Sequence, residues 1–539
     1  MPAGRREEAS AKRLTLAACI LGSSIALLDG TVVNVALPTI QRALGGGLAA
    51  QQWTVNAYLL TLGSLILVGG SLGDVFGERR VFALGVSGFG AASLACACSP
   101  SIGVLVAMRA VQGVAGALLV PSSLAVIVNT FAEDERGKAI GSWTAWGAIA
   151  GVVGPLAGGE LLAIASWRWI FLINLPLVIA CVTLILTVMP PAAARAGSEG
   201  PAVAADGGAA DGGATAALGP TPARRHGRRG RRVDVLGGGL CALGLGGPVF
   251  ALIEQPRLGW SSLGVVLPLA LGVALFALFL AYEARTRDPM LPLRLFRRRN
   301  FSAGNAQTLA MYAGLSILFF FLILFLQQIG GYTPLKSGLA TLPVTVLMFV
   351  LSRRFGALAD RFGPRLFMGA GPLLVFALGL SMTVAPLTAA VLAGSEHEAG
   401  IASGVNNAVA RVAGLLGTAA VGAAISASFA GSLQQRLSGT ALGAAARAAV
   451  REARRLPLGR PRLHGLPAAQ AHAVRAAAEA ASLHAFHLGM AIAAVLVAVG
   501  GVAGAVGIRN PRRPAVSAAD CAGGQLVGGV DAETAETAA

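Results

Sequence analysis

Long apolar runs separated by short polar segments extend along most of the 539-residue chain. Most of them reach the length of about 20 residues that a helix needs to cross a hydrocarbon core about 30 Å thick. Helices are favoured in lipid because they satisfy their own backbone hydrogen bonds. The pattern predicts an all-α polytopic membrane protein with about 13 transmembrane helices. The runs cover residues 14–37, 52–73, 81–98, 101–128, 139–163, 168–189, 235–253, 262–283, 302–326, 337–351, 366–393, 400–429 and 483–508.

The spacing of the runs divides the chain into two blocks of membrane helices. Residues 190–232 are rich in Ala, Gly and Arg, a composition typical of a flexible linker. A second polar stretch, 430–482, interrupts the last helices. The predicted order is a cytoplasmic N-terminus 1–13, an N-terminal six-helix bundle 14–189, the cytoplasmic linker 190–232, two extra helices 233–284, a basic cytoplasmic loop 285–300, a C-terminal bundle 301–508 with the insertion 430–482, and a disordered tail 509–539.

Charge is scarce and unevenly distributed between the two sides that the runs define. Charged residues make up 12% of the chain, about half of the share in a soluble protein. Through the tenth run, 25 Lys and Arg residues fall on the side of the N-terminus, and only Arg42, Arg168, Arg257 and Lys336 fall on the other. Positive residues favour the cytoplasmic side, so we expect a cell-membrane protein with a cytoplasmic N-terminus. The net charge of +17 then reflects membrane orientation rather than nucleic-acid binding.

The run at 366–393 decides the topology of everything after it. Its 28 residues span about 42 Å as one helix and only about half of that as each of two helices. We therefore predict a single crossing, which places 430–482, with its eight arginines, in the cytoplasm and the C-terminus outside. The alternative is a hairpin or re-entrant segment, which would place 430–482 outside and the C-terminus in the cytoplasm.

Asp29 lies deep in the first run, where a carboxylate is costly and indicates a functional site. Burial disfavours the charged form, so such a group could take up and release a proton. Arg109, in the fourth run, is a candidate partner because a buried guanidinium needs acceptors. We expect this pair to carry proton coupling, and a purely structural hydrogen bond or ion pair is the alternative.

The fifth run contains a dense set of small residues within GAIAGVVGPLAGG. Small residues at helical spacing allow two membrane helices to approach closely, and a proline invites a kink. We predict a bent helix that packs closely against a neighbour, at an interface where two bundles can close or separate. The alternative is a helix-packing face without a role in transport. Its residues are Gly147, Gly151, Gly154, Pro155, Gly158 and Gly159.

A charged loop recurs in the two halves of the chain. GGSLGDVFGERR follows the second run, and FGALADRFGPR follows the tenth. Asp74 is a candidate for capping the next helix or for pairing with another bundle. Recurrence at a corresponding place is typical of an internal repeat, and we predict a gating loop formed by Gly70, Asp74, Gly77, Arg79, Asp360 and Arg361.

Further polar residues inside apolar runs are candidates for a substrate-binding or polar cavity. They are Asn34, Gln112, Asn406, Asn407 and Arg411. The sequence contains no metal-ligand spacing and no Walker A, HExxH or nucleophile-elbow motif in context. We therefore predict neither an enzyme nor a cofactor, and any pumping would draw on an ion gradient.

Several ordered motifs together resemble one transporter family. LDGTVVNVALP, GGSLGDVFGERR, RAVQG and GVVGPLAGG are similar to motifs of the major facilitator superfamily, and within it of the fourteen-helix drug:proton antiporters of the QacA/EmrB type. By the count of apolar runs, we expect this chain to have one helix fewer in its C-terminal half than that family. The resemblance implies a two-bundle transporter in which Arg109 takes part in proton transfer and Gly147 to Gly159 form the antiporter motif.

The function that follows is proton-coupled efflux of small amphipathic drugs or antibiotics by alternating access. The expected partners are protons, a small-molecule substrate and the lipid bilayer, with no nucleic acid, and the protein is expected to act as a monomer. One alternative is a narrow-specificity exporter of a solute or lipid. Another is a transport-incompetent, truncated relative that acts as a non-transporting membrane protein.

Overall fold

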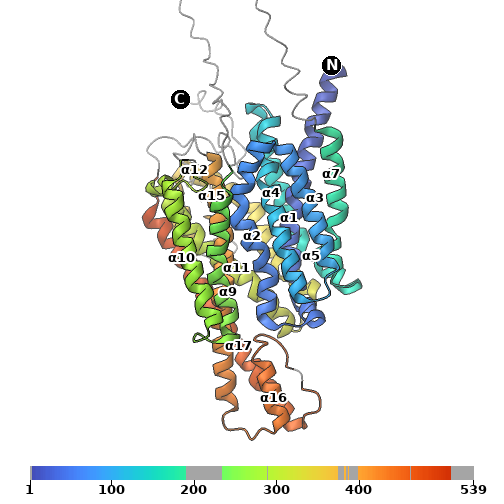
Figure 1. Ribbon diagram of the computed structural model, residues 1–539, viewed down its shortest axis with the longest axis vertical. Helices are drawn as coiled ribbons and strands as arrows, with labels where there is room; N and C mark the ends of the chain where they lie inside the picture. Colours follow the sequence, from blue (N-terminus) through green and yellow to red (C-terminus); the bar gives the residue numbers. More distant parts are fainter. Residues whose placement is uncertain are drawn as a thin grey trace, which may run out of the picture.

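The computed structural model describes residues 3–189, 233–287, 289–373, 399–461 and 463–510, together with residues 382, 383 and 387. All regular elements in this part of the chain are helices (Figure 1). The linker 190–232, nearly all of the tail 509–539 and most of the predicted run 366–393 lie outside the described residues.

The first six predicted runs form one bundle of helices (Figure 1). The turn between its first two helices uses positive φ angles at Gly45 (81°) and Gly46 (101°), which glycine adopts without steric cost. Ser101 caps the fourth helix by accepting a hydrogen bond from the Val104 amide. The elements are α1 (Ala3–Leu44), α2 (Gly47–Phe76), α3 (Glu78–Ala97), α4 (Ile102–Thr130), α5 (Glu133–Ile164), α6 (Trp169–Leu172) and α7 (Asn174–Val188).

A helical hairpin, α9 (Val235–Leu258) and α10 (Leu263–Arg285), follows the linker. Side-chain caps begin both helices, because Asp234 accepts from the Gly237 amide at 2.7 Å and Ser262 accepts from the Gly264 amide at 3.2 Å. Helix α9 packs against α2 of the first bundle and α15 of the second, so the hairpin touches both.

The second bundle contains the remaining long helices. Its core helices α11, α15 and α17 pack against one another, and α12 extends beside α5 of the first bundle. Its elements are η1 (Leu293–Arg297), α11 (Arg299–Gln328), α12 (Pro334–Phe362), α13 (Pro364–Ala370), η2 (Gly371–Leu373), α15 (Ala399–Leu437), α16 (Ala444–Ala453) and α17 (Ala468–Gly507).

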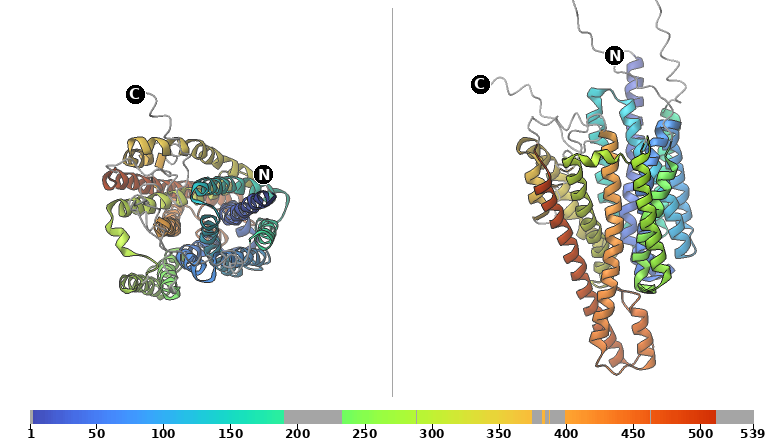
Figure 2. Two further views of the ribbon diagram at one scale, coloured as in Figure 1. Left: turned by 90° about the horizontal axis from the view of Figure 1, so that it is seen from above. Right: turned by 60° about the vertical axis from the view of Figure 1, so that its left-hand side comes forward.

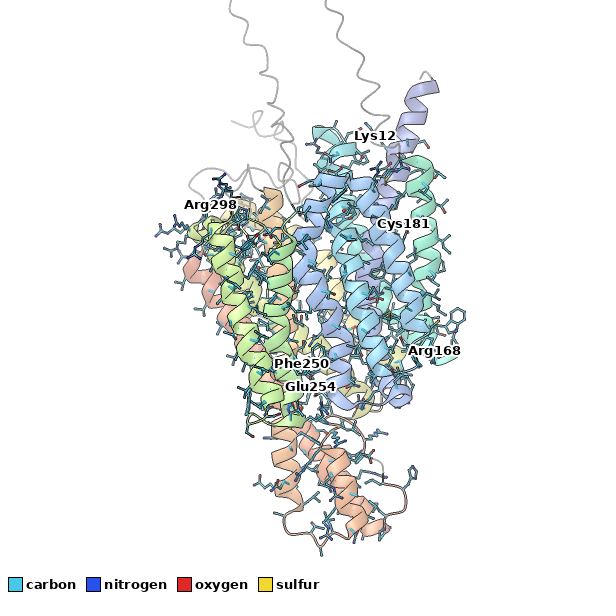
Figure 3. The ribbon with its side chains drawn as sticks, viewed as in Figure 1. Lys12, Arg168, Cys181, Phe250, Glu254 and Arg298 are labelled. Atoms are coloured by element: carbon cyan, nitrogen blue, oxygen red, sulfur yellow. The ribbon has the colours of Figure 1, made fainter. Side chains whose placement is uncertain are left out.

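The predicted membrane helices are confirmed over most of the chain. Eleven helices of the described part are long and apolar enough to cross a membrane, and each matches one predicted run. The run 337–351 lies within α12. We call the end of the bundle that carries Lys12 and Arg298 the inner end, and the end that carries Arg168 and Glu254 the outer end (Figure 3).

The predicted single crossing at 366–393 is wrong. Arg365 donates a hydrogen bond to the Ala505 carbonyl at 2.6 Å, and Arg299 donates to that of Gly507 at 2.9 Å, so α17 ends at the inner end. Helix α15 begins at the same end, since a Cβ on Gly404 would lie 3.0 Å from Leu67 in the inner half of α2. Arg365 and the start of α15 therefore lie at the same end, whereas a single crossing predicts opposite ends.

The insertion 430–482 correspondingly lies at the outer end, opposite to its predicted side (Figures 1 and 2). Arg460 donates a hydrogen bond to the Gln328 carbonyl at 2.9 Å, and the Arg455 carbonyl lies against Gly47. Helices α15 and α17 have 39 and 40 residues. At 1.5 Å per residue each is about twice as long as the hydrocarbon core, so both project beyond it and carry α16 between them.

Candidate functional site

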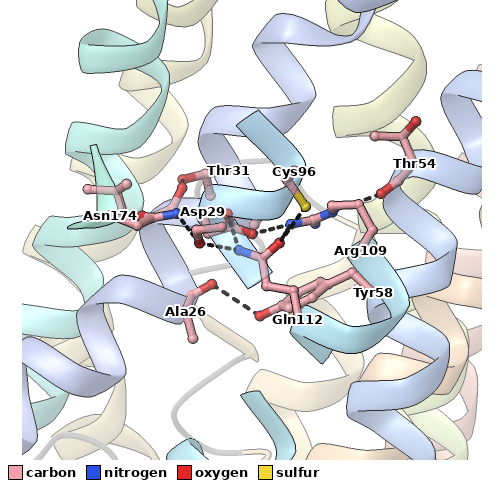
Figure 4. A network of polar contacts seen from close by, with 12 residues as sticks. Ala26, Asp29, Thr31, Thr54, Tyr58, Cys96, Arg109, Gln112 and Asn174 are labelled. Atoms are coloured by element: carbon pink, nitrogen blue, oxygen red, sulfur yellow. Dashed lines mark hydrogen bonds and ion pairs between the residues drawn. The ribbon is translucent and has the colours of Figure 1, made fainter. Parts of the chain in front are cut away.

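A buried ion pair lies inside the first bundle, where α1 and α4 place Asp29 and Arg109 side by side (Figure 4). The two side chains are 0% and 1% exposed. Nη1 of Arg109 donates to Oδ2 of Asp29 at 2.5 Å, and Nε donates to the Thr54 carbonyl of α2 at 3.0 Å. The structure thus brings together the two residues that the sequence singled out, and it adds α2 as an anchor for the guanidinium.

The second oxygen of Asp29 accepts from two amides. Gln112 donates to Oδ1 at 2.9 Å, and Asn174 of α7 donates to the same atom at 3.0 Å. Gln112 also accepts from Nη1 of Arg109 at 2.7 Å, and both amides contact the hydroxyl of Ser93 on α3. Side chains of α4 and α7 thereby donate to one carboxylate of α1, with Ser93 of α3 bound to the two amides.

The ring of Tyr58 covers the other side of the ion pair. The Arg109 guanidinium carbon lies 4.4 Å from the ring centre, within the range of a cation–π contact. The Tyr58 hydroxyl donates to the Ala26 carbonyl of α1 at 3.4 Å. Because both oxygens of Asp29 accept hydrogen bonds, protonation of Asp29 would remove the negative charge that faces Arg109.

Asn34 lies one to two turns beyond Asp29 on α1. Its amide nitrogen donates to the Gly30 carbonyl at 3.2 Å, and its buried Oδ1 has no hydrogen-bond partner among the described residues. Gln112, predicted to face a cavity, is instead fully buried in the Asp29 network. Asn34 therefore remains a candidate for contact with a bound molecule, and Gln112 belongs to the ion-pair site.

The glycines of α5 pack against the same turn of α1 that carries Asp29. A Cβ at Gly154 would overlap with Thr31 and lie 3.1 Å from the Leu28 carbonyl, and one at Gly158 would overlap with Val32. A Cβ at Gly147 would lie 3.0 Å from Leu27, two residues before Asp29. The two helices approach closely because these side chains are missing.

Gly151 and Gly159 differ from this pattern. A Cβ at Gly151 would meet no atom within 4 Å, so the expected close approach at this position is wrong. A Cβ at Gly159 would lie 2.6 Å from the Leu335 Cα of α12, and one at Gly338 would lie 2.7 Å from the Pro155 carbonyl oxygen. We call this contact of α5 with α12 the outer seam, since it joins the two bundles near the outer end.

The predicted gating loop lies at the inner end of α2 and α3. Gly77, with φ of 91°, is the N-cap residue of α3. Asp74 is exposed, and Arg79 donates to the carbonyls of Ile185 and Leu186 at 3.2 and 3.3 Å. The loop thus ties α3 to the end of α7.

The other predicted loop residues make weaker contacts. A Cβ at Gly70 would lie 3.7 Å from Pro121 of α4. Arg361 is exposed and lies 5.7 Å from the ring centre of Phe362. Asp360 belongs to α12, and its side chain lies outside what the structure describes.

The predicted polar residues of α15 lie in the second bundle. Asn406 accepts a hydrogen bond from the Thr308 hydroxyl of α11 at 2.8 Å. Asn407 and Arg411 follow on the same helix and are partly exposed. None of the three contacts the Asp29 network by a hydrogen bond within the described residues.

Sequence reasoning did not single out Asn174, Ser93, Tyr58 or Thr54. Small hydroxyls and amides are common in membrane helices, so composition alone does not distinguish them. Asn174 stands within IFLINLP, between apolar residues, and that isolation is the one signal available for it. No group of three or more His, Cys, Asp or Glu in the described part is arranged to hold a metal ion.

Comparison with family models gives a match to the Major Facilitator Superfamily over residues 19–449. This range contains the Asp29 network, the outer seam and the extra hairpin.

Named relatives are resistance and export proteins. The chain is 31% identical over 434 residues to a tetracenomycin C resistance and export protein of Streptomyces glaucescens, covering 76% of this chain and 75% of that protein. It is 35% identical over 427 residues to a puromycin resistance protein of Streptomyces alboniger, covering 73% and 78%. It is 31% identical over 436 residues to a multidrug resistance protein of Mycobacterium tuberculosis, covering 76% and 75%.

A solved structure shares the fold. A bacterial homologue of the human lysosomal transporter Spinster, in an inward-facing and unoccupied conformation, aligns with a TM-score of 0.57 at 15% identity. The alignment covers 93% of this chain and 99% of the other.

Proposed function

This chain belongs to the major facilitator superfamily, and from that premise we propose that it exports small antibiotic-like molecules in exchange for protons. It is a membrane transporter and not an enzyme, as its family and its relatives show. Relatives named for resistance or export match it over about three-quarters of their length, which disfavours the alternative of a truncated, non-transporting protein.

The observation that carries the proposal is the buried pair of Asp29 and Arg109. An ionisable group inside a membrane bundle is costly and is retained where protons or ions move. Asp29 has its charge balanced by Arg109 and two amide donors, and its partners come from α4 and α7. Protonation of Asp29 removes the charge that holds Arg109, so the network has two stable arrangements that a proton can select.

Coupling to transport would pass through α5. Its glycines lie against the turn of α1 around Asp29, and its outer part forms the outer seam with α12. Closely packed helices move together, so a rearrangement of α1 on protonation would also move α5. Movement of α5 would open or close the outer seam. This is the alternating access of one bundle against the other.

The orientation of the protein is part of the proposal. The sequence places 25 Lys and Arg residues through the tenth run on the side of the N-terminus and 4 on the other, which favours the cytoplasm of a cell membrane for the inner end. Export then requires substrate binding from the inner end and release at the outer end.

The proposal is tested by transport in proteoliposomes. Purified full-length protein is reconstituted, a pH gradient is imposed, and movement of fluorescent dyes and of puromycin is followed together with internal pH. We expect the gradient to drive accumulation in the wild type, and Asp29→Asn to abolish it because the variant cannot exchange a proton.

Glu135→Gln is the matched control. Glu135 is an exposed carboxylate paired with Lys12, so its loss should leave transport unchanged. Gradient-driven transport that persists in Asp29→Asn would refute the role of Asp29, and absence of proton movement in the wild type would refute antiport.

A further inference from the structure

Arg411 is a second arginine in the interior of the membrane domain. It follows the start of α15 by 12 residues, about 18 Å along the helix, which places it near the middle of the hydrocarbon core. Its Cβ lies 3.2 Å from the position that a Cβ on Gly63 of α2 would take, so it faces the first bundle.

Helix α15 is enclosed on several sides. It packs against α2, α9, α11 and α17, and it lies near the centre of the molecule when seen from above (Figure 2). Arg411 nevertheless keeps a partly exposed side chain. Together with the contact to Gly63 of α2, this places the base of its side chain at the boundary of the two bundles.

Arg411 makes no hydrogen bond and no ion pair with any residue that the structure describes, whereas Arg109 has Asp29, Gln112 and Thr54. The run 366–393, most of which lies outside the described residues, contains no carboxylate, because no Asp or Glu occurs between Asp360 and Glu396. Arg411 thus has no carboxylate partner among the residues that the structure describes.

Two tyrosines lie on helices that pack against α15. Tyr58 belongs to α2 of the first bundle, and Tyr312 belongs to α11 of the second. Tyr58 also covers Arg109, so the unpaired cation and the proton site share one aromatic neighbour. An amphipathic molecule that reached this position would present an oxygen anion to the guanidinium of Arg411.

We propose that Arg411 is the receptor for an acidic group of the exported substrate, such as a carboxylate, phenolate or enolate. A guanidinium presents paired donors that match such oxygens, and a cation without a partner in a membrane protein indicates a ligand site. The inference rests on the proposed export function and narrows its substrate class, which the sequence had left as amphipathic small molecules. Molecules that carry only positive charge would be disfavoured.

The test uses dyes that differ by one carboxylate. Rhodamine 110 is a free acid and rhodamine 123 is its methyl ester, and fluorescein and its methyl ester form a second pair. Binding to the purified full chain in nanodiscs at pH 7.5 is measured by fluorescence polarisation. We expect the wild type to bind an acid about tenfold more tightly than its ester, because a charge-assisted hydrogen bond is lost in the ester.

Three variants identify the residue responsible. Arg411→Gln should reduce the acid-to-ester ratio to about one, and Arg411→Lys should retain part of it. Arg436→Gln removes the same charge from the exposed end of α15, where Arg436 donates to Ser432, and should leave the ratio unchanged. The melting temperature of Arg411→Gln should not fall, since no contact within the described residues depends on that side chain.

The inference is overturned if neither acid binds more tightly than its ester, if Arg411→Gln keeps the preference, or if Arg436→Gln loses it equally. If Arg411→Gln does not fold, the wild-type ratio and Arg411→Lys still decide. Proton-driven transport of an ester without binding of acids would leave the proposed function intact and refute this inference. Binding of acids that depends on Arg411, without proton-driven transport, would support this inference and refute the proposed function.

Discussion

Asp29 and Arg109 are 80 positions apart in the chain and in direct contact in the fold. Replacing one member of a buried ion pair leaves the other charged and unpaired, which typically costs about 3–5 kcal/mol, whereas removing both is far less costly. A double-mutant cycle can therefore distinguish the contribution of the pair to stability from its contribution to proton coupling.

We predict that Arg109→Gln lowers the thermal stability of the detergent-solubilised protein, and that Asp29→Asn in the same chain restores most of it. Neither variant should drive transport with a pH gradient, because neither retains a titrating carboxylate held by a guanidinium. Thermal unfolding of the single and double variants measures the coupling. Additive effects of the two substitutions would show that the pair contributes nothing beyond its separate contacts.

Helix α5 connects the ion-pair site with the outer seam. Gly154 lies against α1 near Asp29, and Gly159 lies against α12. Gly151 belongs to the same motif but faces open space, so the two halves of the motif can be tested separately.

We predict that Gly154→Leu abolishes transport and that Gly154→Ala impairs it less, because a Cβ there already overlaps with Thr31. Gly151→Leu, the matched control, should retain most activity, since nothing lies within 4 Å of its Cβ. Dye efflux at equal expression measures the difference. Equal activity of the two leucine variants would show that the approach of α5 to α1 is not needed for transport.

Across the whole molecule, the arginine-rich insertion stands at the outer end, despite a charge that favours the other side. The positive-inside rule is strongest for short loops close to the ends of membrane helices. Here many of the arginines lie on α16 and on the projecting parts of α15 and α17. Their distance from the membrane weakens the rule, and this is why the charge count misplaced the segment.

We predict that a cysteine at Gly439 is labelled from outside intact cells by a membrane-impermeant maleimide. Gly439 is exposed between α15 and α16, and a Cβ there meets no atom within 4 Å. The background should carry Cys98→Ser, because Cys98 is exposed at the outer end. A cysteine at Phe362, exposed at the inner end, should react only after permeabilisation. The reverse pattern would place the insertion in the cytoplasm.

The sequence by itself determined the membrane helices, the two-bundle organisation and the residues of the ion pair. Each of these depends on local properties, namely the length of an apolar run and the cost of a charge within it. Asp29, Arg109 and Arg411 could all be found in this way, because a charged residue in an apolar run is conspicuous without knowledge of its neighbours.

Only the tertiary structure decided which of these residues meet and on which side the last helices lie. Asn174 and Ser93 became part of the site because α7 and α3 bring them to Asp29, and nothing in their own segments requires it. Arg109 and Arg411 look alike in sequence, yet Arg109 donates to three acceptors, whereas Arg411 has no hydrogen bond within the described part of the chain. Pairing depends on contacts between helices far apart in the chain, and neither hydropathy nor spacing along one helix contains that information.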